Sequence, residues 1–176
     1  MFSDPILHIE HLDIDQGMKV ADIGAGSGHH TMHIAKAVGE TGTVYAIDVQ
    51  KELLARIKSE ANHNKLHNVE IVWADIEKPG ATRIQNGLMD RAILSNVLFQ
   101  LEDKRNAVGE IKRILKPGGK LIVIDWSDSF SQLGPHKDMV VGPVEAVALF
   151  SANGFEKERE FDAGSHHYGI IFKKQQ

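Results

Sequence analysis

The sequence lacks cysteine, long apolar runs and clusters of basic residues, and each absence excludes a class of protein. Without cysteine, the chain can form neither a disulfide bond nor a thiolate metal site. No apolar run approaches the ~18 residues that a membrane-spanning helix needs. The 20 lysines and arginines are scattered and the net charge is −4, so the sequence shows no footprint for a nucleic-acid backbone. Nucleic acid is therefore a disfavoured partner, and no membrane span is expected.

The first ten residues also lack the features of a secretory signal. They carry neither a basic region nor a continuous apolar segment, so a cytoplasmic location is expected. Hydrophobic residues make up 42% of the chain and charged residues 25%, as in ordinary globular proteins. With 176 residues, no linker and no internal repeat, the chain is predicted to form a single domain spanning 1–176.

A glycine-rich turn at residues 20–28 organises the rest of the sequence. It reads Val-Ala-Asp-Ile-Gly-Ala-Gly-Ser-Gly, an apolar run that ends in an acid and continues with glycines at every second position. The spacing of a helix face follows at Thr31, Ile34, Ala35 and Val38. The pattern predicts a strand, a tight turn and a helix. Glycines let the backbone approach a ligand closely, and the helix N-terminus presents free N–H groups.

Two details argue against a dinucleotide at this turn. The dinucleotide fingerprint needs a small residue three positions after the second glycine, but that position holds His29. Asp22 lies two residues before the first glycine, where a carboxylate would repel a pyrophosphate and suit a positively charged ligand. S-adenosylmethionine carries such charge on its sulfonium and ammonium groups.

Two later apolar runs also end in acids. The run 43–48 ends at Asp48, which lies 20 residues after Gly28. An α/β nucleotide-binding fold places a carboxylate at this point to accept hydrogen bonds from the ribose hydroxyls. The alternative role of Asp48 is to cap the following helix. The run 69–75 ends at Asp75.

Together these stretches resemble the motifs of class I S-adenosylmethionine-dependent methyltransferases. The resemblance covers residues 17–126 and includes the Leu-Lys-Pro-Gly-Gly turn at 115–119. The chain is similar in particular to the small bacterial type of the ubiquinone/menaquinone-biosynthesis group. The resemblance implies S-adenosylmethionine as cofactor, with Val49 against the adenine and Asp75 accepting from the adenine amino group. The cofactor-binding residues that it implies are Asp22, Gly24, Ala25, Gly26, Gly28, Asp48, Val49, Asp75, Ile76 and Asn96.

The order of these elements predicts an α/β fold with a doubly wound, Rossmann-like sheet. The resemblance implies seven strands, mostly parallel, with an antiparallel last strand. Residues 90–96 and 120–126 supply the fourth and fifth strands, and 155–161 with 166–173 is predicted to form a terminal β-hairpin.

The sequence also predicts the structure of two segments outside the sheet. Residues 1–16 are predicted to form a short amphipathic helix, which lies either over the cleft or at the sheet edge. Residues 79–89 are expected to form a polar loop and a short helix before the fourth strand.

The sequence says less about the side of the cleft that would bind the methyl acceptor. The stretch 95–99 should face the transferred methyl group, and it lacks the two prolines with which adenine and some amide N-methyltransferases shape a slot for a flat amine. Asn96, Asp125 and His136 are the polar residues expected near the cleft. Asp125 has a structural role as an equal alternative, and His136 is better explained as loop surface. No catalytic residue can be assigned.

The ten histidines raise the alternative of a metal site, notably His29, His30 and His33, or the pair His63 and His67. A zinc site needs three or four ligands with oriented partners, and no carboxylate lies at a suitable position in the sequence. We therefore expect no metal and solvated histidines on helix surfaces.

The sequence predicts a methyltransferase that moves a methyl group from S-adenosylmethionine to a small-molecule acceptor. Two alternatives remain: a protein that binds the cofactor without catalysis, and an NAD-dependent oxidoreductase. The sequence does not identify the acceptor, because substrate elements vary within a fold while the cofactor half stays recognisable.

Overall fold

The sheet of this protein has seven strands in the order β3-β2-β1-β4-β5-β7-β6. The structure is a computed structural model that describes residues 5–129 and 134–176, with side chains from residue 7 onward. The strands are β1 (Lys19–Ile23), β2 (Thr43–Asp48), β3 (Val69–Trp73), β4 (Met89–Ser95), β5 (Leu115–Trp126), β6 (Phe155–Asp162) and β7 (His167–Lys174). Strands β1 to β5 pair in parallel, whereas β7 is antiparallel to both of its neighbours. The predicted fold class is confirmed.

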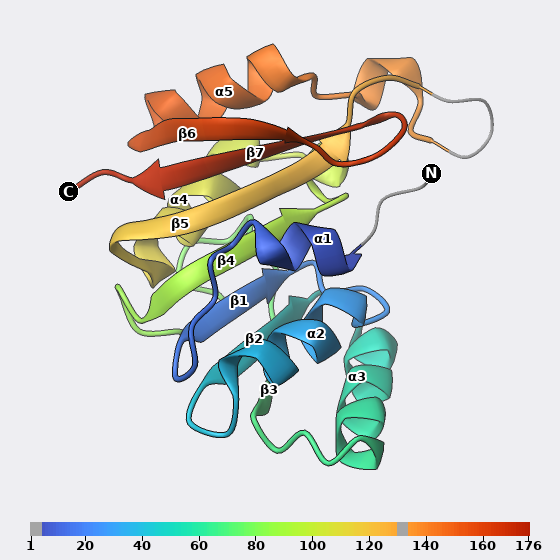
Figure 1. The fold of residues 1–176 in the computed structure, drawn as a ribbon. Helices are drawn as coiled ribbons and strands as arrows, with labels where there is room; N and C mark the ends of the chain where they lie inside the picture. Colours follow the sequence, from blue (N-terminus) through green and yellow to red (C-terminus); the bar gives the residue numbers. More distant parts are fainter. Residues whose placement is uncertain (1–4, 130–133) are drawn as a thin grey trace.

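Helices cover both faces of this sheet (Figure 1). They are α1 (Pro5–Glu10), α2 (His29–Val38), α3 (Lys51–His63), α4 (Lys104–Ile114) and α5 (Pro143–Ala152), with short 3-10 helices η1 (Leu98–Gln100) and η2 (Lys137–Met139). Buried side chains of α1, α2 and α3 pack on one face, and those of α4 and α5 pack on the other. Because the central strands are covered from both sides, their sequences are continuous apolar runs. No helix that the structure describes is long and apolar enough to cross a membrane.

Three phenylalanines join α5 to the terminal hairpin. The ring of Phe150 stacks on Phe172 with centroids 4.7 Å apart and meets Phe155 edge-on at 5.7 Å. All three side chains are fully buried. Aromatic pairs in these geometries add about 0.5–1.5 kcal/mol beyond the area that they bury. The cluster therefore fixes the two outermost strands to the rest of the core.

The short helix expected within residues 79–89 is not present; turns connect β3 to β4. Glu110 of α4 explains the difference, because its carboxylate accepts hydrogen bonds from the Gly80 N–H (2.8 Å) and the Thr82 hydroxyl (2.6 Å). Arg113 pairs with the same carboxylate at 2.7 Å and donates to the Ile84 carbonyl at 2.6 Å. These bonds satisfy the loop backbone without helical hydrogen bonds. Side-chain partners far along the chain determine the conformation of this loop.

The Leu-Lys-Pro-Gly-Gly segment lies inside β5 rather than before it. The expected fifth strand begins at residue 120, but pairing with β4 already starts at Leu115, opposite Met89. The register then shifts, so that Arg91 pairs with Lys120. Between these two pairs β5 has more residues than β4, and a β-bulge accommodates the extra ones.

Helix α1 lies on the same face of the sheet as α2 (Figure 1). Ile9 and Leu12 are buried in one cluster with Ile124 of β5 and Ile171 of β7. Arg91 holds the end of this segment, because its side chain donates to the Leu12 carbonyl at 2.8 Å. The predicted helix 1–16 is thus shorter than expected, and its residues 1–4 lie outside the described part of the chain.

Candidate functional site

A cavity of about 530 Å³ opens at the carboxyl ends of four parallel strands. Open α/β sheets bind ligands at this edge, and small-molecule sites are typically of about 300–1,000 Å³. Its walls include the segments that follow β1, β2, β3 and β4. Eight of the ten predicted cofactor-binding residues line it, namely Gly24, Ala25, Gly26, Asp48, Val49, Asp75, Ile76 and Asn96. Asp22 and Gly28 are not among the lining residues.

The glycine turn is attached to β2 and leaves no room for side chains at two positions. The N–H groups of Gly24 and Ala25 both donate to the Ile47 carbonyl, at 2.8 and 3.0 Å. A Cβ atom on Gly24 would lie 2.2 Å from Val97 Cγ2, and one on Gly28 would lie 2.8 Å from Ile57 of α3. Gly28 therefore permits helix packing behind the turn instead of facing the cavity.

Asp22 is buried beneath the turn. Its Oδ2 accepts a hydrogen bond from the Thr31 hydroxyl at 2.5 Å. Burial raises the pKa of Asp22 to about 6, against the opposing effect of the Thr31 hydrogen bonds. The role of this carboxylate toward a positively charged ligand stays a prediction. Its observed contact joins β1 to the first turn of α2.

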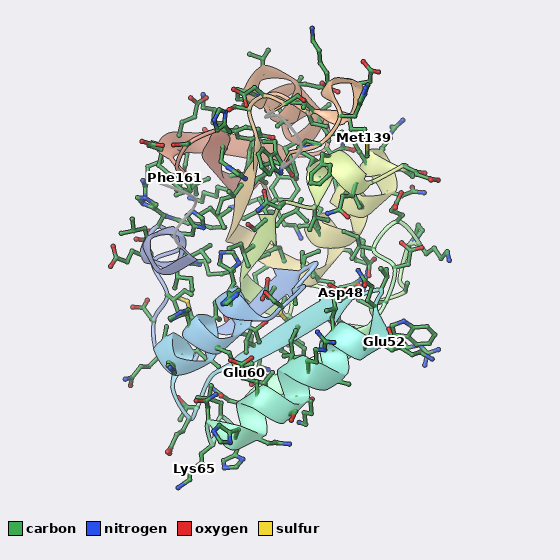
Figure 2. The ribbon with its side chains drawn as sticks, turned by 90° about the vertical axis from the view of Figure 1, so that its right-hand side faces the viewer. Asp48, Glu52, Glu60, Lys65, Met139 and Phe161 are labelled. Carbon is green, nitrogen blue, oxygen red and sulfur yellow. The ribbon has the colours of Figure 1, made fainter. Side chains whose placement is uncertain are left out.

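Asp48 reaches the cavity from the end of β2, beside the start of α3 (Figure 2). Its side chain is buried, with a relative exposure of 8%. Oδ2 accepts from the Gly26 N–H and Oδ1 from the Gln50 N–H, both at 2.9 Å. Gln50 itself occupies the cap position of α3, so Asp48 does not cap that helix. A carboxylate has about four acceptor sites, and two remain for a ligand.

Asp75 and its neighbours form the end of the cavity next to β3. Oδ1 of Asp75 accepts from the Glu77 N–H at 3.0 Å, and Oδ2 lies 3.3 Å from the Lys78 ammonium. Ile76 is buried, whereas Val49 is exposed at the cavity rim. The indole of Trp73 donates to the Val49 carbonyl at 3.0 Å and so fixes the backbone there.

Asn96 follows β4 with a backbone φ of 57°, in the left-handed region that asparagine tolerates better than most residues. Its N–H donates to the Ile124 carbonyl at 2.8 Å, and its carbonyl accepts from Gln100 Nε2 at 2.7 Å. The side-chain Oδ1 is buried without a hydrogen-bond partner in the described part of the chain. A buried acceptor without a partner at a cavity wall points to a ligand donor.

Asp125 and His136 are not among the residues that line the cavity. Asp125 is fully buried and accepts hydrogen bonds from the N–H groups of Leu98 and Trp126, each at 2.8 Å. Burial raises the pKa of Asp125 to about 6, although backbone N–H groups oppose this effect. His136 is exposed and lies 3.2 Å from the carboxylate of Asp138. The structural alternative for Asp125 and the surface alternative for His136 agree with these positions.

The histidines differ in environment. His63 and His67 are exposed, as expected. His30 is instead partly buried, lines the cavity and has its Nε2 3.3 Å from Nδ1 of His8. Burial, together with the nearby imidazoles, lowers the pKa of His30 to about 4. Within residues 5–129 and 134–176, no group of three or more histidines and acids is arranged to hold a metal ion.

Several lining residues were not predicted from the sequence. They are Ile23, Ser27, His29, His30, Ile47, Gln50, Leu53, Ala74, Glu77, Gln100 and Leu101. All except Leu53 lie within two positions of a predicted residue or of the stretch 95–99, so extending each predicted segment by two residues would have included them. Leu53, in the first turn of α3, had no such signal.

Comparison with known proteins identifies the family. Residues 14–164 match the model of a methyltransferase domain. UbiE of Erwinia tasmaniensis, a ubiquinone/menaquinone biosynthesis C-methyltransferase, is 32% identical over 116 residues, which cover 65% of this chain and 45% of that protein. UbiE of Escherichia coli O1:K1 is 32% identical over 115 residues, with the same coverage. The chain spans about half the length of these curated relatives.

Solved structures show the same fold along nearly the whole chain. A SAM-dependent methyltransferase from Aquifex aeolicus superposes with a TM-score of 0.89 at 27% identity, covering 98% of this chain and 90% of that one. The [4+2]-cyclase SpnF superposes with a TM-score of 0.82 at 17% identity, covering 97% and 80%. The second likeness concerns the fold alone. The chain belongs to the methyltransferase domain family, and the predicted resemblance to class I S-adenosylmethionine-dependent methyltransferases is confirmed.

Proposed function

We propose that this protein transfers a methyl group from S-adenosylmethionine, the cofactor of its family, to a small-molecule acceptor at the cavity described above. The observation that carries the proposal is the row of groups along the carboxyl ends of β3, β2, β1 and β4. In that order they are Asp75, Asp48, the glycine turn and Asn96. This row suits a long ligand with an adenine at one end and an amino acid at the other.

The residues present fit such a ligand. Asp48 retains two acceptor sites for ribose hydroxyls, and Asp75 with Val49 and Ile76 forms the place for the adenine. A Cβ atom on Gly26 would have no neighbour closer than 3.8 Å, so the turn is open above this residue. The unpartnered Oδ1 of Asn96 is an acceptor that an ammonium group can satisfy.

S-adenosylmethionine supplies a methyl group on a cationic sulfur, which leaves as a neutral thioether on transfer. The chain need not provide a nucleophile for this displacement. Its residues bind and orient the two reactants, an effect that lowers barriers by roughly 7 to 11 kcal/mol in favourable cases. Val97 and Leu101 of the segment after β4 contribute apolar surface that excludes water from this part of the cavity.

The acceptor is a separate question. UbiE is named a C-methyltransferase of ubiquinone/menaquinone biosynthesis. Carbon acceptors therefore belong in a screen of candidate substrates. Since the chain spans about half of that relative, the acceptor of UbiE is not transferred to this protein. The scattered basic residues favour a small molecule over a nucleic acid.

The first test is calorimetry with S-adenosylhomocysteine and S-adenosylmethionine, followed by a screen of acceptors that measures S-adenosylhomocysteine production. Binding and acceptor-dependent turnover are expected. If the folded protein binds neither compound at millimolar concentration, the proposal is wrong.

A second candidate function is binding of the cofactor without catalysis. It is favoured by one observation: Asp125, the acid at the end of β5, is occupied by backbone N–H groups and does not line the cavity. Saturable turnover with any acceptor would exclude this candidate. The NAD-dependent alternative is not retained, because the chain belongs to the methyltransferase domain family.

A further inference from the structure

The two ends of the cavity differ in charge. Asp48, Asp75 and Glu77 lie toward the ends of β2 and β3. Among the described residues that line the cavity there is no lysine or arginine, and the titratable bases are His29 and His30. S-adenosylmethionine has a carboxylate at its amino-acid end. That carboxylate is repelled by the acidic end of the cavity, and a positively charged or hydrogen-bonding partner would have to come from the histidines or from amides.

His30 lies on the side of the glycine turn that faces α1. Its ring stacks on His8 with centroids 5.6 Å apart, and the ring of Phe161 in β6 lies 6.3 Å from that of His8. Phe161 also contacts the ring of His11, so this side lies toward β6, at the opposite edge of the sheet from β3 and Asp75. With adenine at Asp75, the amino-acid end of the cofactor extends toward His30.

The hydrogen bonding of His30 leaves one nitrogen for a ligand. Its Nε2 is within 3.3 Å of His8 Nδ1, so one of these two atoms carries the proton between them. When His8 donates, the neutral ring of His30 carries its proton on Nδ1 and can donate it to an oxygen of a ligand. The pair thus supplies a donor even without net charge.

We propose, on the basis of the proposed function, that His30 binds the carboxylate of the cofactor's amino-acid end and takes up a proton when that carboxylate arrives. The titratable groups that act on the imidazole in the free protein are themselves imidazoles: His8 from α1, and His29 and His33 from α2. Together with burial they hold the pKa of His30 near 4, so the ring is neutral at pH 7. A carboxylate beside the ring favours the charged form and raises this pKa.

This proton uptake sets the direction in which ligand affinity changes with pH. Because the complex holds the proton more tightly than the free protein, affinity for an anionic ligand end rises as the pH falls toward the free-protein value. A ligand without the carboxylate gives no such dependence. If binding raises the pKa from about 4 to roughly 6, affinity should increase roughly tenfold between pH 8 and pH 5.

The experiment compares S-adenosylhomocysteine with 5′-methylthioadenosine, which has the same nucleoside and thioether but lacks the amino-acid end. Calorimetry is run from pH 5 to pH 8, in buffers of different ionisation enthalpy so that proton uptake is counted. The variants are His30→Phe, which keeps a ring against His8, and His63→Phe as a matched control at an exposed histidine of α3 outside the cavity lining.

In the parent, S-adenosylhomocysteine should bind with proton uptake and gain affinity at low pH, whereas 5′-methylthioadenosine should do neither. His30→Phe should weaken S-adenosylhomocysteine roughly ten- to hundredfold, leave 5′-methylthioadenosine nearly unchanged and abolish the pH dependence. His63→Phe should behave like the parent.

An unchanged affinity ratio of the two ligands in His30→Phe overturns the inference while leaving the proposed function intact. If His30→Phe does not fold, His30→Gln and the proton count of the parent still decide, because binding of S-adenosylhomocysteine without proton uptake also overturns it. If the parent binds neither ligand, the proposed function fails and this inference with it.

Discussion

The carboxyl ends of β2 and β5 both carry an aspartate, and the two side chains have different environments. Asp48 reaches the cavity and keeps two acceptor sites beyond its bonds to Gly26 and Gln50. Asp125 is 0% exposed and is used by the N–H groups of Leu98 and Trp126. The aspartate of β2 therefore faces the cavity with acceptor sites to spare, whereas the aspartate of β5 is bonded to backbone N–H groups. Position at the carboxyl edge alone does not make an acid a ligand-binding group.

The largest expected effect comes from Asp125→Ala. It leaves the buried N–H of Leu98 and the partly buried N–H of Trp126 without this acceptor, and an unsatisfied buried donor costs about 1–3 kcal/mol. The free energy of unfolding should fall by roughly 3 kcal/mol or more, and affinity for S-adenosylhomocysteine should fall with it because the loosened segment includes Val97. Urea denaturation and calorimetry measure the two quantities. The control is Asp128→Ala, which removes an exposed acid three positions further along the chain and should change both quantities little.

Gly24→Ala tests the contact between the two halves of the edge. The new methyl group would meet Val97 Cγ2 at 2.2 Å, and the residue has a φ of +68°. Overpacking costs about 1–3 kcal/mol, and a left-handed conformation adds roughly 1 kcal/mol. Adding Val97→Ala should recover the overpacking part but not the backbone part, as thermal unfolding of the double variant would show. No recovery would mean that backbone strain alone accounts for the loss.

Asp48→Ala should affect binding more than folding. If its carboxylate accepts both ribose hydroxyls, affinity for S-adenosylhomocysteine should fall roughly ten- to hundredfold, since hydrogen bonds to a charged group contribute about 1.5–3 kcal/mol. Calorimetry beside a thermal melt measures this. Asp48→Asn should be milder. A variant that binds like the parent but unfolds earlier would show that Asp48 only anchors the turn through Gly26.

Asp75→Ala should have the smallest effect. The carboxylate is partly exposed and shared with Lys78, so its bond to the adenine contributes about 1 kcal/mol, or a fewfold to tenfold in affinity. The sharper measurement is discrimination between S-adenosylhomocysteine and its inosine analogue, which lacks the amino group. The ratio of the affinities for these two ligands should fall in Asp75→Ala and stay as in the parent in Lys78→Ala. Equal discrimination in all three proteins would place the amino group elsewhere.

Sequence reasoning succeeded where the signal was local. The apolar runs predicted the five parallel strands, and the glycines with the acids at strand ends located the cavity. These features depend on residues that are close in sequence, such as Gly24 and Gly26, because a strand, turn and helix are built from one short segment. The cofactor half of the edge was therefore predictable in outline.

The remaining features depend on contacts between distant segments. The loop before β4 donates hydrogen bonds to Glu110. Asp125 accepts a hydrogen bond from Leu98, which lies 27 positions earlier in the chain. His30 is buried because α1 places His8 against it, which no spacing within α2 could indicate. Gly28 and Asp22 carry the family pattern, but their side of the turn faces α3 and Thr31.

The place of β7 in the sheet has a consequence for synthesis on the ribosome. Strand β5 has its second neighbour in residues 167–174, and β6, although made earlier, joins the sheet only through β7. Until those residues emerge, the apolar strand β5 has an unpaired edge, which is a surface that promotes association between chains. Completion of the sheet is therefore a late event in the emergence of the chain. A pause before residue 167 would prolong the interval in which a chaperone has to protect that edge.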